Sequence, residues 1–406
     1  MLALNSFKKK SSSSPHFVVL DIGSDFVKAL IIERSEEEGK ELKVVGVGLA
    51  PQGLADTRLG VVADIKTVAK NVETALGEAS LSCDADPREV VLGVSGTMVR
   101  GLATRVRLTR SHPDRPLTEK ELAHIERKVR DAAFIECSEE VARARGQSNL
   151  KIKIINSEIT GAEVDGFPVS GLLGFKGERV ELSFFAASSL ANHLHALETV
   201  VRSVGLKPVA VVSEMYALLK ALVRGREPSE VDAVIVDIGG ETTDIGIVFG
   251  GMVVATETLA IGGRDFTRVL SRKRDLPFPE AENLKLRYVA GETSPEETEA
   301  IRELLRTVSE IWLVGVREAL GGMGEVAKFP AKVILCGGGS ELPEITNLLD
   351  SDSFSEGLSF VERPQIKKLA PEDLDFFTDQ TGRIDSAVWV LPLAVGYFAE
   401  LGGVNQ

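Results

Sequence analysis

The stretch Ala233-Val-Ile-Val-Asp-Ile-Gly-Gly-Glu-Thr-Thr-Asp244 is an apolar run that ends in an acidic residue and a glycine turn. The apolar run predicts a buried strand, and Gly239-Gly240 predicts a tight turn directly after it. A second β-like run follows and crosses Gly250-Gly251, a dipeptide suited to a two-residue hairpin turn. This part of the chain therefore predicts successive antiparallel strands whose first turn carries an acidic residue.

The same arrangement occurs near the start of the chain and again near its end. Phe17-Val-Val-Leu-Asp-Ile-Gly-Ser24 precedes a β-like run at 27–33, which predicts a hairpin, and Val333-Ile-Leu-Cys-Gly-Gly-Gly-Ser340 ends in three glycines. Small residues let backbone N–H groups close on a phosphate, and a neighbouring carboxylate can hold hydrated magnesium. Two such turns that face each other can hold the phosphates of a nucleotide. The third offers the close approach that a purine and its ribose need.

Other nucleotide-binding patterns are missing from the sequence. It contains no GxxxxGK[ST] motif, and no GxGxxG follows a predicted strand. A P-loop and a dinucleotide-binding fold are therefore excluded. The two aspartate-led turns instead predict a site between two β-hairpins, with one hairpin from each domain.

The composition sets the class of protein. The 406 residues include 47 basic and 60 acidic side chains, a net charge of −13, and 44% of them are hydrophobic. This describes a soluble globular protein of about two to four domains. The acidic balance argues against nucleic acid as a partner, because phosphate binding needs a basic field. Cys83, Cys137 and Cys336 support neither a disulfide framework nor a metal motif, which favours a reducing cytoplasm, and no apolar stretch is long enough to span a membrane.

Helical periodicity predicts amphipathic helices at 64–81, 188–204 and 296–320. The region from about 88 to 175 differs in texture and predicts a small α+β unit inserted into the first domain, in which Thr118-x-x-Glu121 is a capping box. With no HExxH or Cys/His cluster, the five histidines are interpreted as structural. A cluster of arginines in this region predicts a solvated edge strand rather than a binding patch, since no aromatic residues interleave with it: Arg100, Arg105, Arg107, Arg110 and Arg115.

Three segments resemble the motifs of the actin-like ATPases, the superfamily of actin, sugar kinases and DnaK-type chaperones. Asp21-Ile-Gly-Ser-Asp-Phe-Val-Lys28 is similar to the first phosphate motif, Asp237–Asp244 to the second, and Leu335-Cys-Gly-Gly-Gly-Ser-Glu-Leu-Pro343 to the adenosine motif. The resemblance implies an α/β protein of the actin-like ATPase fold. That fold has two duplicated ribonuclease-H-like domains, here with an inserted small α+β subdomain of the SHS2 or 1C type.

Within this superfamily the chain resembles the bacterial cell-division protein family FtsA. Leu92-Gly-Val-Ser-Gly96 is similar to the segment that enters the inserted 1C subdomain of FtsA, and Ala281-Glu-Asn-Leu-Lys285 is similar to its Ala-Glu-x-x-Lys helix. The resemblance implies the following division: a flexible tail at 1–15, a first actin-like domain (1A) at 16–87 and 176–228, the inserted 1C unit at 88–175, and a second domain (2A) at 229–402. The second domain would include 2B at about 264–312, and its last helix would return to 1A.

The resemblance also implies the residues that bind ATP and magnesium. Asp21 and Asp237 would organise Mg²⁺ through water, and Glu214 would position a metal-bound water, so that Glu214 and Asp237 are the catalytic candidates. Asp244 would support the second loop. On spacing alone, Glu282 and Lys285 are equally well explained as a surface ion pair on a helix. The cofactor-binding set comprises Asp21, Gly23, Ser24, Lys28, Gly239, Gly240, Glu241, Thr242, Asp244, Glu282, Lys285, Gly337, Gly338, Gly339 and Ser340.

Two features depart from the FtsA pattern. Glu241 stands where the family usually has a third glycine, and a carboxylate beside phosphates predicts repulsion and slow hydrolysis, so whether the chain is a slow Mg-ATPase is left open. The chain stops at Gln406, whereas FtsA usually continues to an amphipathic membrane-binding helix. The candidate anchor here is N-terminal, where Met1, Leu2, Leu4 and Phe7 precede the lysines at 8–10.

The resemblance implies a cytoplasmic protein held peripherally at the inner face of the cell membrane. It would polymerise into filaments and link a tubulin-like division protein, through an FtsZ-type C-terminal peptide, to the membrane surface, and it would bind no nucleic acid. The alternatives are a PilM-like ATP-binding protein of type IV pilus assembly, a small-molecule kinase of the same superfamily, and an adaptor that no longer hydrolyses ATP.

Overall fold

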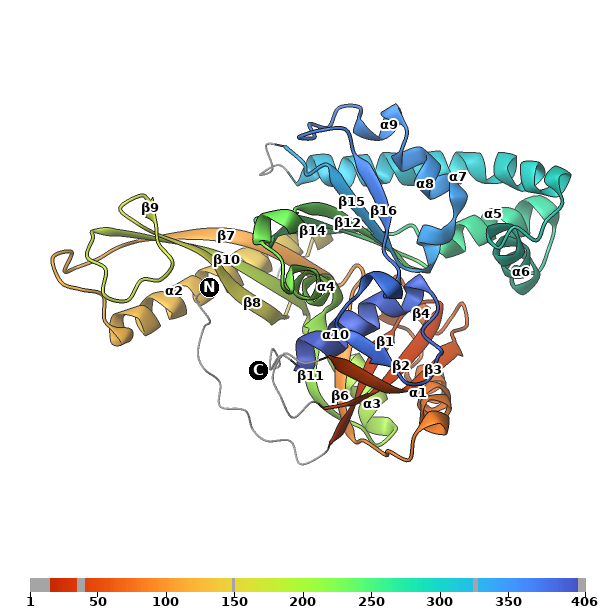
Figure 1. The fold of residues 1–406 in the computed structure, drawn as a ribbon, viewed down its shortest axis with the longest axis horizontal. Helices are drawn as coiled ribbons and strands as arrows, with labels where there is room; N and C mark the ends of the chain where they lie inside the picture. The colour runs from red at the N-terminus through yellow and green to blue at the C-terminus, as the bar shows by residue number, and fades with distance from the viewer. Residues whose placement is uncertain (1–14, 35–40, 148–149, 324–327, 401–406) are drawn as a thin grey trace.

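The computed structural model describes residues 15–34, 41–147, 150–323 and 328–400. The predicted tail and membrane anchor at 1–15 lie outside these ranges except for Pro15. Figure 1 shows three bodies: one around β1 and α1, one around β12 and α7, and an arm formed by β7, β8, β10 and α2. None of the helices in the described ranges is both long and apolar enough to cross a membrane.

The first body is built on a six-stranded sheet with the order β11-β6-β1-β2-β3-β17. The first three strands form an antiparallel meander, and β6 and β11 then continue the sheet parallel to β1. The predicted first hairpin is confirmed. The strands are β1 (His16–Ile22), β2 (Phe26–Glu33), β3 (Leu42–Pro51), β6 (Glu89–Val94), β11 (Lys207–Ser213) and β17 (Phe377–Asp379), and a small separate ribbon comprises β4 (Thr57–Arg58) and β5 (Val61–Val62).

Apolar helices cover both faces of this sheet. Helix α1 (Ile65–Ala79) begins at Asp64, whose carboxylate accepts the N–H groups of Lys66 and Thr67, and packs its buried stripe on one face together with α3 (Ala191–Ser203). On the other face lie α4 (Glu214–Val223) and α10 (Val390–Glu400), whose side chains share one core with residues of both large sheets. These two helices therefore connect the first body to the second.

The second body repeats the strand order of the first. Strands β12, β13 and β14 form an antiparallel meander, and β15 and β16 extend the sheet parallel to β12. The predicted turn at Gly250-Gly251 is confirmed, because both residues adopt positive φ, at 57° and 68°. The strands are β12 (Ala233–Ile238), β13 (Thr243–Phe249), β14 (Met252–Leu259), β15 (Lys332–Cys336) and β16 (Gln365–Lys368).

Helices on the outer face of this sheet complete the second body. Their core centres on Trp312, which is fully buried and donates its indole N–H to Thr243 Oγ1 over 2.9 Å. The helices are α5 (Gly263–Arg274), α6 (Phe278–Val289), α7 (Pro295–Gly322), α8 (Pro343–Leu349) and α9 (Asp352–Ser355). Short 3-10 turns lie at Ser80–Ser82, Pro228–Val231, Gly338–Glu341, Pro371–Asp373 and Ala387–Trp389.

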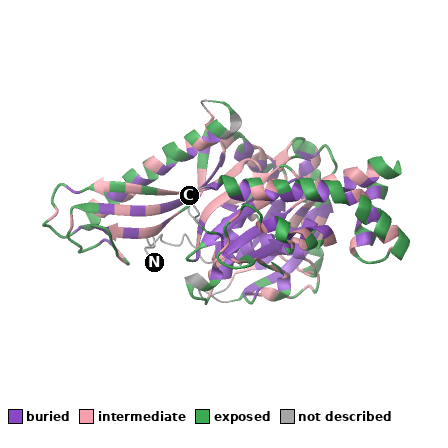
Figure 2. Cartoon of the chain, turned by 90° about the horizontal axis from the view of Figure 1, so that it is seen from above, coloured by how far each residue is buried: buried purple, intermediate pink, exposed green. Residues whose placement is uncertain are grey.

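The inserted unit packs one long helix against a small antiparallel sheet. Thr118 caps that helix, as its sequence predicts, by accepting the N–H of Glu121, and the helix ends at Gly146 in the left-handed conformation. Figure 2 shows the strands of the arm with alternating burial and the exposed loops at its far end. The elements are β7 (Val99–Thr109), α2 (Glu119–Arg145), β8 (Ile152–Val164), β9 (Phe167–Pro168) and β10 (Arg179–Leu190).

Strand pairing favours different limits for the inserted unit from those that the sequence suggests. Strand β6 belongs to the first sheet, whereas β10 pairs with β7 and β8 in the arm. An inserted unit of 99–190 therefore fits the pairing better than 88–175. The helix predicted from Ser188 begins at Ala191 instead, because the last residues of β10 still pair in the sheet.

The sheet of the inserted unit is continuous with that of the second body. Strand β14 pairs with β7 at Ala255 and Leu102, giving a nine-stranded sheet with the order β16-β15-β12-β13-β14-β7-β10-β8-β9. Beside this pair, the N–H of Gly101 donates to Thr256 Oγ1 over 2.7 Å. In the sequence, the inserted unit is preceded and followed by elements of the first body. Its sheet, however, is hydrogen-bonded to the sheet of the second body.

The predicted solvated edge strand is only partly correct. Arg105 and Arg107 are exposed and pair with Glu181, but β7 lies between β14 and β10 and is not an edge. The Arg110 side chain is buried and forms a two-pronged ion pair with Glu121. Tertiary contacts that sequence spacing does not show therefore divide the arginines between the surface and the interior.

Candidate functional site

A cavity lies where the two bodies meet, at the turns that join β1 to β2 and β12 to β13. The Gly337–Gly339 turn after β15 closes a third side. Most of the residues predicted from the sequence line this cavity: Asp21, Gly23, Ser24, Lys28, Glu214, Asp237, Gly239, Gly240, Thr242, Gly337, Gly338 and Gly339. Segments far apart in the chain thus converge as the sequence predicts.

The first turn holds a largely buried ion pair, in which the Lys28 side chain is 16% exposed. Asp21 near the end of β1 faces Lys28 on β2 as a registered pair of strand residues, and the two side chains meet at 2.6 Å. The N–H of Gly23 donates to Phe26 O over 3.1 Å and closes the turn. Gln52, directly after β3, also donates to Gly23 O over 2.8 Å, so the turn is supported from there as well.

The carboxylates around Lys28 have altered acidities. Burial raises the pKa of Asp237 to about 7, and the neighbouring Asp244 and Asp21 carboxylates add to the rise. Burial and then Asp21 also hold the pKa of Glu214 well above its usual range. For Lys28, burial opposes the charged form, but Asp21, Glu214 and Asp237 together outweigh it and raise the pKa. Lys28 is therefore the cation that balances this acidic set.

Close approach explains why glycines occupy the other two turns. A Cβ on Gly240 would lie 2.5 Å from the carboxylate of Asp25, in the opposite body. Gly337 has a φ of +78°, and a Cβ there would lie 2.3 Å from Asp237 Oδ1. Both turns thus present backbone rather than side chains to the cavity.

Five predicted residues do not line the cavity, and two of these support its loops. Asp244 accepts the N–H of Gly96 over 3.2 Å and also bonds Thr258, so it connects the second loop to the first body. Burial raises the pKa of Asp244 to about 6, although the bonds to Thr258 and Gly96 oppose the rise. Ser340 is buried and donates to Gly337 O over 2.7 Å, which holds the glycine turn.

Glu282 and Lys285 form an ion pair, but not a surface one. Lys285 is buried, and its Nζ bonds Thr267 Oγ1 and Glu282 Oε2, each over 2.9 Å, and Gly263 O over 3.2 Å. The surface interpretation was therefore wrong for Lys285. Both residues lie behind the second loop, against α5, and do not line the cavity.

The structure corrects the placement of Glu241. The sequence predicted its carboxylate beside the phosphates, but the side chain lies outside the cavity and is buried between the two bodies. Glu241 Oε2 accepts the N–H of Leu59 over 2.6 Å, while Oε1 faces Arg268 and Arg264. The two arginines and the Leu59 N–H hold the Glu241 carboxylate on the side of the loop that faces away from the cavity. Repulsion between the Glu241 carboxylate and the phosphates is therefore no longer a reason to expect slow hydrolysis.

Sequence reasoning missed several residues at this site. Asp25, Ser95 and Gly96 line the cavity, and all three lie within the motifs quoted above without having been assigned a role. His193, treated as structural, also lines it. Its Nδ1 has no hydrogen-bond partner in the described part of the chain, and burial lowers its pKa to about 4. Arg264 had no sequence signal, because its guanidinium hydrogen bonds are made to residues of the first body, far away in the chain.

The cavity suits a nucleotide with hydrated magnesium. Glu214 Oε1 is buried without a hydrogen-bond partner among the described residues, and the carboxylates of Asp21 and Asp237 lie nearby. No three His, Cys, Asp or Glu side chains within the described ranges converge closely enough to hold a bare metal ion. Magnesium usually keeps several of its waters, and Asp21, Asp237 and Glu214 are the side chains that would hold them.

Comparisons of sequence relate the chain to cell-division proteins. A family model for cell division protein FtsA matches residues 234–370. FtsA of Pseudomonas aeruginosa is 28% identical over 360 residues, covering 83% of this chain and 81% of that protein. FtsA of Neisseria meningitidis is 24% identical over 405 residues, covering 93% of this chain and 89% of that protein.

Comparisons of structure relate the fold to actin-like proteins. The chain matches a PilM–PilN type IV pilus biogenesis complex with a TM-score of 0.66 at 20% identity, covering 96% of this chain and 98% of that one. It matches MreB5 of Spiroplasma citri bound to AMPPNP with a TM-score of 0.50 at 14% identity, covering 97% and 98%. At these identities the likeness concerns the fold.

The repeated sheets, the helices between them and these neighbours define the actin-like ATPase fold, with two duplicated ribonuclease-H-like domains and an inserted α+β subdomain. Within this class, the chain is FtsA-like in sequence.

Proposed function

We propose that the chain is an ATP-binding cytoskeletal protein of bacterial cell division. The proposal rests on one observation. Two aspartate-led turns, one from each duplicated sheet, lie on opposite sides of a single cavity, and the Gly337–Gly339 turn forms its third side. The sequence relatives, all cell-division proteins among those reported, support the cellular role.

In this proposal both turns bind the phosphates, and their aspartates bind the hydrated magnesium. Backbone N–H groups of the glycine turns and the hydroxyls of Ser24 and Thr242 hold phosphate oxygens, and Lys28 supplies a positive charge. Asp21 and Asp237, which line the cavity, would hold waters of a magnesium ion, and buried Glu214 would orient one of those waters. When bound, magnesium neutralises phosphate charge. The Gly337–Ser340 turn takes the nucleoside, and Glu282 and Lys285 support the start of α5 behind the second turn.

Isothermal calorimetry with ATP and Mg²⁺ tests the site. Asp237→Asn keeps the shape of the side chain but cannot carry the negative charge that attracts the metal, so Mg²⁺-dependent affinity should fall at least tenfold, or about 1.4 kcal/mol. The fold should survive, because the substitution removes a buried charge. Asp352→Asn, at an exposed position on α9, is the matched control. Unchanged affinity in Asp237→Asn would refute the assignment.

We also propose the domain division that the FtsA likeness implies. The first and second bodies correspond to 1A and 2A, with 2B at about 264–312 and α10 returning to 1A. The inserted unit corresponds to 1C, with limits near 99 and 190 as strand pairing favours.

The proposed partners are a tubulin-like division protein and further copies of this chain in filaments, in the cytoplasm at the inner face of the membrane. The alternative is a PilM-like role in type IV pilus assembly. Co-purification from the native cell distinguishes the two. Recovery of an FtsZ-type protein supports division, whereas recovery of pilus assembly proteins supports the alternative.

The proposed membrane contact is the apolar and lysine-rich segment at 1–10, whose own affinity should be marginal and should require many tails in one filament. Co-sedimentation with anionic vesicles under polymerising conditions tests it. Full-length protein should pellet in a salt-sensitive way, and a variant lacking residues 1–10 should not. Equal pelleting of the two would reject this segment as the anchor.

The second alternative is a small-molecule kinase of the same superfamily. Such an enzyme needs a general base that faces a buried hydroxyl substrate. Transfer of phosphate from ATP to glycerol or a hexose, measured with purified protein, would favour this alternative over a cytoskeletal role.

A further inference from the structure

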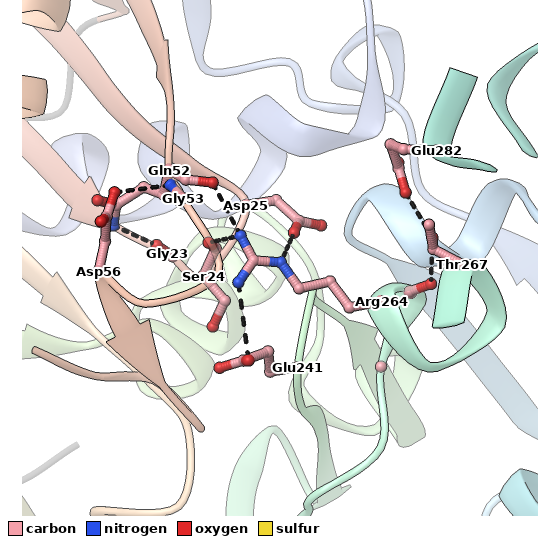
Figure 3. A network of polar contacts seen from close by, with 12 residues as sticks. Gly23, Ser24, Asp25, Gln52, Gly53, Asp56, Glu241, Arg264, Thr267 and Glu282 are labelled. Carbon is pink, nitrogen blue, oxygen red and sulfur yellow. Dashed lines mark hydrogen bonds and ion pairs between the residues drawn. The ribbon is translucent and has the colours of Figure 1, made fainter. Parts of the chain in front are cut away.

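Arg264 is a buried cation at the junction of the two bodies. It lies in the first turn of α5, in the second body, and its side chain is only 3% exposed. Figure 3 shows its guanidinium reaching across to the first body, between the loop at Ser24 and the carboxylate of Glu241. A buried arginine requires acceptors for its donors, so the groups it contacts are fixed by it.

The guanidinium bonds three groups of the first body. Its Nε lies 2.6 Å from Asp25 Oδ1, and its Nη2 donates to Ser24 O over 2.6 Å and to Gln52 O over 3.0 Å. Ser24 and Asp25 belong to the first phosphate turn, and Gln52 supports that turn through Gly23. Arg264 therefore holds the first turn in two ways: through the main-chain carbonyl of Ser24 and through the charged carboxylate of Asp25.

The backbone of Arg264 is fixed to the second phosphate turn. Its N–H donates to Gly240 O over 2.7 Å, and the N–H of Gly263 donates to Gly239 O over 2.9 Å. Its Nη1 lies 3.7 Å from Glu241 Oε1, so the acidic residue of the same turn also faces it. One residue thus contacts both phosphate turns.

Two further contacts close the same end of the cleft, by which we mean the space between the two bodies that holds the cavity. Glu241 accepts the N–H of Leu59, and Asp244 accepts the N–H of Gly96, and both donors belong to the first body. The carboxylate of Asp25 lies against Gly240 with no room for a Cβ between them. At this end the two bodies are therefore in direct contact.

The same helix also contacts Glu282 and Lys285, which lie behind the second phosphate turn. Thr267, one helical turn after Arg264, bonds Lys285 Nζ over 2.9 Å and the carboxylate of Glu282. Movement of α5 relative to the first body would therefore displace these residues together with the second phosphate turn.

We propose that Arg264 is a positioning residue that fixes the first phosphate turn against the second and thereby sets the rate at which a nucleotide enters and leaves. The effect on the nucleotide rests on the proposed function. The closure of the two turns by Arg264 does not depend on it. Opening the cleft at this end requires the guanidinium to leave three acceptors at once. Lysine cannot replace it, because an ammonium group lacks the fork geometry that reaches all three.

Amide hydrogen exchange in the nucleotide-free protein tests the closure directly. The N–H groups of Leu59 and Gly96 bond across the cleft, so their exchange reports its opening. In Arg264→Met both amides should exchange at least tenfold faster than in the wild type. Arg272→Met, at an exposed position of the same helix, should leave them unchanged.

Stopped-flow release of a fluorescent ATP analogue with Mg²⁺ tests the consequence for the nucleotide. Dissociation should be at least tenfold faster in Arg264→Met and in Arg264→Lys. Asp25→Asn keeps an oxygen that can accept from Nε and should fall between these variants and the wild type. Should Arg264→Met not fold, Arg264→Lys serves for both measurements, because it keeps the buried charge.

The outcomes separate this inference from the proposed function. Unchanged exchange of Leu59 and Gly96 in the Arg264 variants would overturn the closure, whatever the protein binds. Unchanged dissociation with faster exchange would overturn the effect on nucleotide rate. If the wild type binds no ATP while the amides respond as expected, the proposed function fails and the closure by Arg264 stands.

Discussion

Lys28 Nζ lies 2.6 Å from Asp21 Oδ2, and the two residues face each other across the first hairpin as a registered pair. The sheet register, rather than a loop conformation, brings the cation to the carboxylate. Lys28 is therefore in place before any ligand arrives, and it also faces the buried carboxylates of Glu214 and Asp237.

Lys28→Met should destabilise the protein as well as weaken ATP binding. The substitution leaves the buried carboxylates without their cation, and breaking a buried pair in this way costs about 3 kcal/mol. Urea unfolding measures this loss, and calorimetry measures ATP affinity. Lys43→Met, which removes an exposed pair with Glu33, is the control and should cost no more than about 1 kcal/mol. Equal stability of the two variants would show that Lys28 is not needed to balance the carboxylates.

His193 should make the protein less stable in mild acid. Burial lowers its folded pKa from the usual 6.5 to about 4, so between these values the unfolded chain binds a proton that the folded chain does not. Above pH 6.5 His193 is neutral in both the folded and the unfolded chain, so the free energy of unfolding keeps its full value. As the pH drops from 6.5 towards 4, that free energy falls by about 3 kcal/mol in total.

Urea unfolding at a series of pH values checks this sign and size. His193→Gln should flatten the profile between pH 6.5 and 4, whereas His195→Gln, on the exposed face of the same helix, should leave it as in the wild type. Parallel profiles for the wild type and both variants would contradict the assignment.

Glu241→Ala should lower the free energy of unfolding by about 2 kcal/mol. It leaves the N–H of Leu59 without its acceptor and removes the carboxylate that faces Arg264 and Arg268, and an unsatisfied buried donor costs about 1–3 kcal/mol. Glu299→Ala, which removes an exposed pair on α7, is the control and should be nearly neutral.

Glu241→Gly should not accelerate ATP turnover, because the carboxylate lies away from the cavity. Single-turnover hydrolysis of bound ATP by the wild type and this variant tests the point, because it leaves out nucleotide release, to which the Glu241–Leu59 contact between the bodies contributes. A faster variant would mean that Glu241 does oppose the phosphates.

Gly337→Ala should damage both stability and the site. Its φ of +78° alone disfavours a side chain by about 1–2 kcal/mol, and a Cβ would lie 2.3 Å from Asp237 Oδ1. Gly382→Ala is the matched control, because its φ is +65° but no atom lies within 4 Å of the added Cβ. Thermal unfolding should therefore separate the two variants, and ATP affinity should fall only in Gly337→Ala.

Local sequence patterns predicted much of the fold. The Gly250-Gly251 turn, the Thr118 cap and the first hairpin depend on residues close together in the chain, and the structure confirms each. The limits of the inserted unit were less well predicted. The end of β10 and the start of a helix have the same apolar pattern around Ser188, and only pairing with β7 and β8 distinguishes them.

The predicted site residues converge because β12 and β15 are parallel neighbours that end side by side, and the turn after β1 lines the same cavity from the other body. Residues whose roles depend on the other body were predicted poorly. Glu241 turns away from the cavity because Leu59 and Arg264 lie across the junction, and no spacing in the sequence shows this. Arg264 was missed for the same reason.

The single strand pair of Ala255 and Leu102 has a mechanical consequence. Both ends of the inserted unit continue into the first body, yet its sheet is hydrogen-bonded to β14 of the second. A rotation between the bodies must therefore either break this pair or swing the whole arm (Figure 1). An arm that swings about its attached end converts a small angular change at the cleft into a larger displacement at its far loops. Phe167, Leu173 and Phe175 are exposed in those loops, so the side chains that would travel furthest are apolar.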